Sequence, residues 1–525
     1  MLRSTAELLC GSAMIVHARP PLSRAVWVVG AGIALLLLST AGRYGIFRDE
    51  YYYLMCADHP AWGYVDHPPL AMFLLALWKA VFGSSVTALR IPPSLLGGMV
   101  AVGAALVARE MRGGAVAQSM AALTAGLMPG TLALGSFYSM NSFDVVLWVL
   151  VVWIACRLLD PAGDRRWWWG LGGAVGLGLL NKYSMGFLCV GLGLGILMSP
   201  LRRELFTRQR LAGTLVVLLI VSPHVLWQIR QGWPTPEFIH NAQGVKNVAL
   251  DPAEFWGEQL LLAHPGFLPV WVIGLSCLLF MPRLRPWRPL GMAFVVIGLW
   301  HTVSRAKPYY LVPAYPMLMA AGSAVITGWL SLRGRALRVI MVSLPVLLAV
   351  QGILIAPMAI PVLRPDAYVA YEQALGLRPK NMEQNAVGVL PQHFADRFGW
   401  EELAVTVRKV VSALPEATRS QTLVVAGNYG ECGAINYWGL PPGVPPSVSG
   451  HNSCFSWWPA DFRPEIVVVI GIPREKVGEV FEIVQLGAVH DSQWAMPYEQ
   501  EVPIWVCRGW KVEPAVVRKS LRFAI

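Results

Sequence analysis

Long apolar runs separated by short polar turns occupy the chain up to about residue 358. They recur too often for the core of a soluble domain. A helix needs about 20 residues to cross a bilayer core of ~30 Å, so we predict about eleven transmembrane helices, some of them short. The runs lie near residues 25–42, 91–108, 115–130, 143–158, 168–180, 184–199, 211–229, 265–281, 289–304, 309–330 and 339–357.

Basic residues in the turns predict the orientation of these helices. Arginine clusters fall on alternate turns, and all of them lie in the cytoplasm if residues 1–24 do, as the positive-inside rule requires. An odd number of spans then places everything after residue 358 outside. We expect a multi-pass protein of a bacterial inner (plasma) membrane. The clusters are Arg109/Arg112, Arg157/Arg165/Arg166, Arg202/Arg203/Arg208/Arg210, Arg283/Arg285/Arg288 and Arg333/Arg335/Arg338.

The outer segments differ from simple turns. Residues 43–90 form a first outer loop in which Ala71–Phe82 is short enough to lie along the membrane surface. Residues 25–358 are predicted to form a membrane-embedded domain, and residues 359–525 an extracytoplasmic α/β domain. Its expected elements are strands at Thr422–Gly427, Glu465–Gly471 and Ile504–Arg508, and helices at Trp400–Leu414 and near 474–486.

The composition supports a membrane protein and argues against a nucleic-acid-binding protein and against a zinc or CxxC redox site. Only 14% of residues are charged and 55% are hydrophobic, with a net charge of +11 from 42 basic and 31 acidic residues. The basic excess sits in the turns, so it indicates topology and not nucleic-acid binding. The eight cysteines have no CxxC or zinc spacing. Cys432 and Cys454 fit either a disulfide or two separate buried thiols.

Charged residues at the outer ends of membrane helices are costly and are therefore candidates for function. Arg48, Asp49 and Glu50 follow the first helix, with Asp66 and His67 downstream. Adjacent helical residues point about 100° apart, so one of Asp49 and Glu50 would act and the other support it. An alternative is that Asp49 merely caps a short helix.

Cations form a second set on the same predicted face. Lys182 lies between two short spans, and Arg305 and Lys307 precede Tyr310. Snorkelling at a helix end is an alternative for Lys182, and also for Arg305 together with Lys307. Clustered Arg and Lys also suit a phosphate. A carboxylate could take a proton from a hydroxyl while cations stabilise a departing lipid phosphate. This scheme requires Asp49 and Lys307 to meet on one side of the membrane.

Several motifs together resemble glycosyltransferase family 39, which includes protein O-mannosyltransferases and aminoarabinose transferases and has the GT-C membrane fold. The resemblance covers about residues 25–357. The motifs are RDEYYY at 48–53, DHPPL at 66–70, ALRIPP at 88–93, FYSMNSFD at 137–144, LLNKYS at 179–184 and RAKPYYLVPAYP at 305–316.

The resemblance implies an inverting transfer of a sugar from a polyprenyl-phosphate donor to an extracytoplasmic acceptor hydroxyl on a lipid, polysaccharide or protein. It implies Asp49 as the general base beside Glu50. Donor-phosphate contacts would come from His67, Lys182, Arg305, Lys307 and Tyr310, supported by Asp66, Arg90, Asn141 and Asp144. Several relatives carry an Asp where this chain has Asn141, which leaves a divalent metal ion open, since Asn is a weaker ligand for hard cations.

Two other functions compete. A transporter or flippase of a polyprenyl-linked sugar would explain the cations, but it gives Asp49 and Glu50 no chemical task. A partner-binding outer domain on an inactive membrane part would not need the retained motifs. The sequence identifies neither the sugar nor the acceptor.

Overall fold

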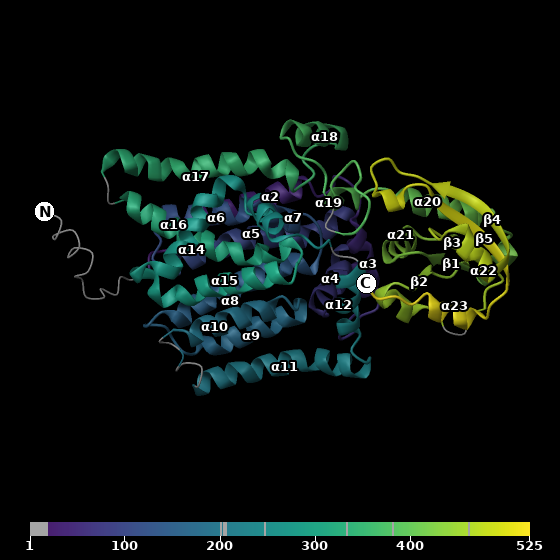
Figure 1. Cartoon of the computed structure of the whole chain (residues 1–525), viewed down its shortest axis with the longest axis horizontal. Coiled ribbons are helices and arrows are strands. Elements are labelled where there is room, and N and C mark those ends of the chain that lie inside the picture. The colour runs from purple at the N-terminus through teal and green to yellow at the C-terminus, as the bar shows by residue number, and fades with distance from the viewer. Residues whose placement is uncertain are drawn as a thin grey trace.

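A bundle of helices carries a small α/β domain at one end (Figure 1). The computed structural model describes residues 19–199, 202, 207–245, 248–331, 334–380, 383–459 and 463–525. Most of the predicted N-terminal segment 1–24 lies outside these residues, as do Arg203 and Arg333 of the basic clusters.

Each of the eleven predicted apolar runs contains a helix. By length and composition, five helices could cross a membrane, or six if a pair bent by 88° at residues 262–265 counts as one span. The helices up to residue 358 are α2 Arg24–Ser39, α3 Arg48–Asp58, α4 Leu70–Phe82, α5 Val86–Glu110, α6 Ala115–Leu127, α7 Pro129–Gly135, α8 Met140–Leu159, α9 Trp167–Asn181, α10 Met185–Leu197, α11 Arg208–Arg230, α12 Pro234–Val245, α13 Pro252–Leu262, α14 Leu268–Phe280, α15 Arg288–Val303, α16 Tyr315–Ser331 and α17 Arg335–Ile355.

Glycine allows neighbouring helices of the bundle to approach closely. A Cβ added to Gly172 of α9 would lie 2.2 Å from the carbonyl oxygen of Gly213 in α11. A Cβ on Gly98 of α5 would lie 2.5 Å from the carbonyl oxygen of Gly30 in α2. Small residues at such contacts are typical of packing between membrane helices, where dispersion forces act at short range.

The α/β domain contains a five-stranded sheet in the order β2-β1-β3-β5-β4. Strand β1 pairs in parallel with β2 and β3, while β5 is antiparallel to both β3 and β4. The three predicted strands correspond to β1, β3 and β5. The elements are α18 Pro365–Ala374, α19 Gln392–Ala395, α20 Trp400–Ser412, β1 Thr422–Ala426, α21 Tyr429–Trp438, β2 Val448–Ser449, β3 Ile466–Ile470, α22 Arg474–Val480, β4 Phe481–His490, β5 Val502–Trp510 and α23 Pro514–Ser520.

The helix predicted near 474–486 is wrong beyond Val480. Residues from Phe481 onward form β4, which pairs with β5 along the sheet edge. Ile483, Leu486 and Val489 are about half exposed on this strand, at 46%, 56% and 52%. Their spacing of three resembles a helical face, but pairing with β5 decides the conformation because strand preference depends on tertiary context.

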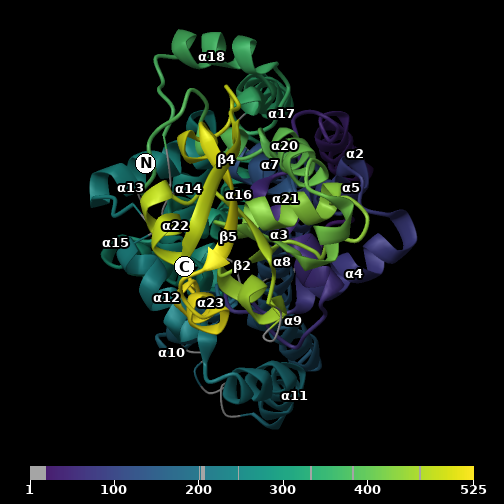
Figure 2. The same ribbon diagram turned by 90° about the vertical axis from the view of Figure 1, so that its right-hand side faces the viewer.

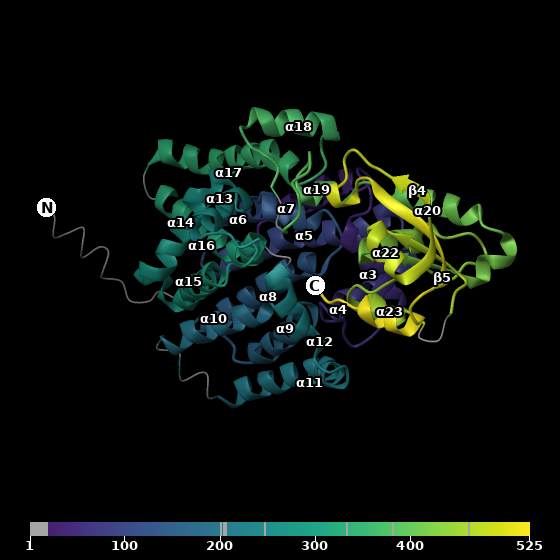
Figure 3. The same cartoon turned by 45° about the vertical axis from the view of Figure 1, so that its right-hand side comes forward.

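The α/β domain packs against the first outer loop of the bundle. Helix α21 lies beside α3, and the turned views show the sheet and its helices covering that end of the bundle (Figures 2 and 3). Arg522 also donates to Glu237 of α12 at 2.7 Å. The described cysteines are free, and the Cys432 thiol donates to the carbonyl of Ser447. The α/β domain thus lies directly against the helix that carries Asp49 and Glu50.

Candidate active site

Glu50 anchors the start of α3. Its carboxylate accepts hydrogen bonds from the backbone N–H groups of Phe47 and Tyr138, both at 2.8 Å, and lies 3.4 Å from Arg90. Arg90 also donates to the carbonyls of Ala41, Arg43 and Gly45. Glu50 and Arg90 are each 1% exposed. Both are therefore structural supports that hold the loop before α3.

Asp49 points away from this buried network. Phe47, not Asp49, is the residue before the first turn of α3, so the capping alternative is wrong. The Asp49 side chain is 30% exposed and accepts a hydrogen bond from the Tyr429 hydroxyl at 2.7 Å. Burial raises the pKa of Tyr429 well above its usual value, which keeps this hydroxyl a donor. The first residue of α21 thus orients Asp49.

Arg48 links Asp49 to the second set of charges. Its Nε lies 3.5 Å from Asp49, and its Nη2 lies 3.3 Å from Glu383. The other oxygen of Glu383 accepts from Lys307 Nζ at 3.1 Å. Asp49 and Lys307 therefore belong to one continuous chain of charges, as the predicted chemistry requires.

Two residues of the α/β domain complete the surroundings of Arg48. Its Nη1 donates to the Tyr498 hydroxyl at 2.7 Å, and this hydroxyl donates to Asp396 at 2.6 Å. Burial raises the pKa of Asp396 to about 6, although the charge of Arg48 acts in the opposite direction. Asp396 therefore remains mostly ionised at neutral pH.

Lys182 lies in a neighbouring cluster. Its ammonium donates to Asn141 at 2.6 Å, lies 3.9 Å from Asp144 and stands 4.6 Å from the ring centre of Tyr310. Asp144 also accepts from Ser184 at 2.7 Å. The structure thus brings together Lys182, Asn141, Asp144 and Tyr310. Asn141 and Asp144 are only two residues with oxygen ligands, and both already face the Lys182 ammonium, so this donor set does not fit a divalent ion. The described residues contain no group of three His, Cys, Asp or Glu suited to a metal.

His67 packs against Tyr52, whose ring also packs against Tyr429, whereas Arg305 lies at the surface. His67 is fully buried, with Nδ1 3.0 Å from the carbonyl of Pro68 and Nε2 3.9 Å from Asp66. Asp66 accepts from Tyr52 at 2.7 Å. Arg305 is exposed and has a positive φ of 50°. These two predicted phosphate contacts are therefore not part of the Arg48–Glu383–Lys307 chain.

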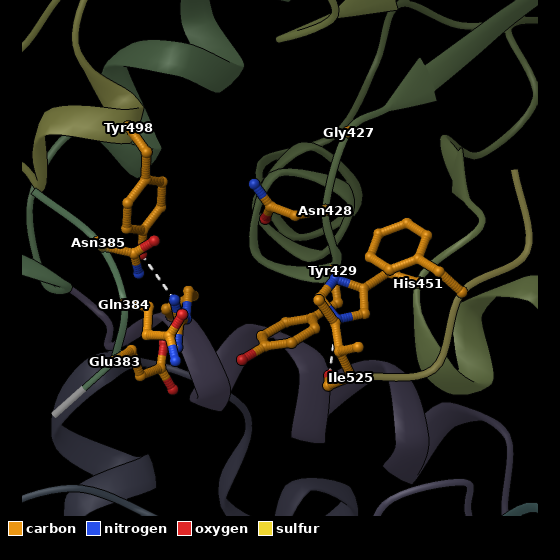
Figure 4. Close-up of a pocket in the computed structure, with 11 residues that line it drawn as sticks. Glu383, Gln384, Asn385, Gly427, Asn428, Tyr429, His451, Tyr498 and Ile525 are labelled. Carbon is orange, nitrogen blue, oxygen red and sulfur yellow. Dashed lines mark hydrogen bonds and ion pairs between the residues drawn. The ribbon is translucent and has the colours of Figure 1, made fainter. Parts of the chain in front are cut away.

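A pocket of about 240 Å³ opens where the two domains meet (Figure 4). Arg48, Glu383, Tyr429 and Tyr498 line it, so residues that contact Asp49 and Lys307 share its wall. Sequence reasoning missed Glu383, Tyr429 and Tyr498, which lie far along the chain from α3. The available signal was the Gly427-Asn428 pair at the end of the predicted first strand, where α/β domains commonly bind ligands.

Comparisons with known proteins show what the chain resembles in sequence and in fold. The profile of the dolichyl-phosphate-mannose-protein mannosyltransferase family matches residues 66–227. A crystal structure of ArnT from Cupriavidus metallidurans bound to undecaprenyl phosphate has a TM-score of 0.61 at 15% identity, covering 92% of this chain and 98% of that one. The chain therefore has the GT-C fold of this transferase, and over residues 66–227 it is similar in sequence to the mannosyltransferase family.

The chain is also similar to a curated transferase and to a further solved structure. It is 27% identical over 294 residues to undecaprenyl phosphate-alpha-4-amino-4-deoxy-L-arabinose arabinosyl transferase 2 of Pseudomonas fluorescens, a match that covers 53% of this chain and 49% of the relative. The match thus spans about half the length of that relative. The archaeal oligosaccharyltransferase AglB of Archaeoglobus fulgidus has a TM-score of 0.50 at 12% identity, covering 85% of this chain and 69% of that one.

Proposed function

We propose that this protein transfers a sugar from a polyprenyl-phosphate donor to a hydroxyl group of an extracytoplasmic acceptor, with inversion at the anomeric carbon. The observation that carries the proposal is the chain of contacts from Asp49 through Arg48 and Glu383 to Lys307. It places a partly exposed carboxylate near a cation in a protein of the GT-C fold. The similar aminoarabinose transferase and mannosyltransferases support the donor class.

Asp49 is the general base in this scheme. It takes the proton of the acceptor hydroxyl as the new C–O bond forms and the bond from the anomeric carbon to the phosphate oxygen breaks. Lys307, Lys182 and Tyr310 stabilise the charge on the departing polyprenyl phosphate. Glu50 and Arg90 support Asp49 by fixing the start of α3.

The proposed topology has eleven spans, a cytoplasmic N-terminus and residues 359–525 outside a bacterial inner membrane. Two features support it. Arg19 pairs with Glu110 at 2.6 Å and Arg112 with Asp160 at 2.8 Å, which joins three basic turns at one end of the bundle. The first turns of α11 and α17 lie at the end opposite the sheet (Figure 1).

The test is Asp49→Asn, because an amide cannot act as a base but its oxygen still accepts from Tyr429. General-base catalysis contributes about 10²–10⁴ in rate, so we expect transfer to fall by that factor. The assay measures release of free polyprenyl phosphate from donor in purified membranes. Asp58→Asn is the matched control, since Asp58 lies in the same helix, is 54% exposed and pairs with Lys79.

Two results would contradict the proposal. Near-normal release by Asp49→Asn would remove Asp49 as the base. Movement of the donor across the membrane by the unmodified protein, with its sugar–phosphate bond intact, would instead favour the transporter.

A further inference from the structure

The pocket lies beside the carboxyl end of strand β1 in the α/β sheet. Strands β1 and β3 are adjacent and parallel, yet the helices that follow them cover opposite faces. Residues of α21 pack with Val424 and Ala426 in one core, whereas Val477 of α22 packs with Leu423 and Val425 in another. The loops after the two strands therefore diverge, and in open α/β sheets ligands bind near such a point, outside the carboxyl ends of the strands. The pocket borders the β1 side of this point, where Gly427 and Asn428 line it.

The chemistry of the pocket suits a sugar ring. Tyr429, His451 and Phe523 form one wall, with ring centres 4.5 and 4.3 Å apart along the row. Figure 4 shows the amides of Gln384 and Asn385 across the pocket from Tyr429 and His451. An amide offers two donors and an acceptor with two lone pairs, which suits neighbouring hydroxyls, while aromatic faces suit the C–H face of a pyranose.

Size and charge narrow the class of ligand. The volume of about 240 Å³ equals that of about eight waters at roughly 30 Å³ each, which suits one monosaccharide better than a larger ligand. Two cations, Arg48 and Lys307, stand with three carboxylates, Asp49, Glu383 and Asp396, in or behind the wall. In the lining itself Arg48 pairs with Glu383, so the wall has no net positive charge to attract a uronic acid.

We infer that this pocket binds an uncharged sugar of the acceptor and presents one of its hydroxyls to Asp49. The inference rests on the proposed function and adds the chemical class of the acceptor. The contact between Tyr429 and Asp49 connects the two sites: Tyr429 lines the sugar pocket, and its hydroxyl ends 2.7 Å from the base. Asp49 takes the proton of the bound hydroxyl, whose oxygen forms the new bond to the donor sugar as polyprenyl phosphate leaves.

Saturation-transfer NMR on the full chain in nanodiscs tests the inference directly. The probes are methyl β-D-glucopyranoside and methyl α-D-mannopyranoside, with methyl β-D-glucuronide as the anionic analogue and a short Ser/Thr peptide as a protein-type acceptor. We expect saturation transfer to at least one neutral pyranoside and a signal at least fivefold weaker for the glucuronide and the peptide.

Gln384→Ala combined with Asn385→Ala should reduce the pyranoside signal at least threefold without changing the affinity for undecaprenyl phosphate. Gln485→Ala is the control, because Gln485 is an exposed amide on the edge strand β4. Binding of the peptide without the pyranosides would overturn the inference, as would a pyranoside signal that survives the double substitution.

The same preparation separates this inference from the proposed function. Release of polyprenyl phosphate without any pyranoside binding would refute the sugar pocket and leave the transferase intact. Pyranoside binding at Gln384 and Asn385 in a protein that never releases polyprenyl phosphate would refute the transferase instead.

Discussion

The Glu383 carboxylate binds the ammonium group of Lys307, which a donor phosphate would also have to contact. Its Oε1 accepts from Lys307 at 3.1 Å and its Oε2 lies 3.3 Å from Arg48, and all three side chains are at most 10% exposed. A phosphate that binds Lys307 must therefore compete with this carboxylate. We predict that Glu383→Gln, which keeps the shape and removes the charge, binds undecaprenyl phosphate more tightly than the unmodified protein.

The size of the gain follows from the hydrogen bond that weakens. A hydrogen bond to a charged group contributes about 1.5–3 kcal/mol, and the bond from the Lys307 ammonium should fall from the upper to the lower end of this range when its acceptor becomes a neutral amide. The substitution thus weakens the interaction that competes for Lys307 by about 1–1.5 kcal/mol, which corresponds to an affinity for the phosphate about 5- to 13-fold higher. Arg48 keeps Asp396 at 3.9 Å and the Tyr498 hydroxyl, so the fold should persist.

Calorimetric titration of nanodisc-embedded protein with undecaprenyl phosphate measures the effect. Glu258→Gln is the matched control, because Glu258 also pairs with a lysine, Lys380 at 2.6 Å, outside the site. An unchanged or weaker affinity of the Glu383→Gln protein, in a sample with normal thermal stability, would refute the assignment of Lys307 to the phosphate.

Two further predictions concern the α/β domain. Tyr429→Phe removes the hydroxyl that orients Asp49, so we expect kcat for polyprenyl phosphate release to fall about tenfold, because a charged hydrogen bond is lost; a change below twofold would contradict this role. Burial raises the pKa of Glu431 from 4.5 to about 7. The folded state therefore holds a proton that the unfolded state releases, and stability should fall as the pH rises from about 4.5 to 7. Thermal unfolding of Glu431→Gln should show a shallower decline in this window, and identical slopes would argue against it.

The apolar runs predicted the helices well because a membrane helix satisfies its backbone hydrogen bonds internally. The physical signal is local and needs no partner. Strand β4 shows the opposite case, since its residues resemble a helical face and only pairing with β5 makes them a strand. The short strands β1 and β3 were predictable because both are continuous β-branched and aliphatic runs buried on both faces.

The acidic pair after the first helix illustrates the limit of sequence reasoning at the site. The sequence predicted that Asp49 and Glu50 have different roles because their side chains diverge on a helix. Which one supports the other depended on Tyr138 and Arg90, which bury Glu50, and on Tyr429, which meets Asp49. The sequence predicted the same role for His67 and Lys182, contact with the donor phosphate. The structure instead buries His67 among tyrosine rings.

The sequence alone determined the membrane character, the α/β nature of the last 160 or so residues and the identity of the charged motifs, because hydropathy and motif spacing are local properties of the chain. Only the tertiary structure decided that Glu383, Tyr429 and Tyr498 join Arg48 around one pocket. These contacts span 335 to 450 positions of the chain. They exist because the α/β domain packs on α3, and no local pattern encodes such a meeting of distant surfaces.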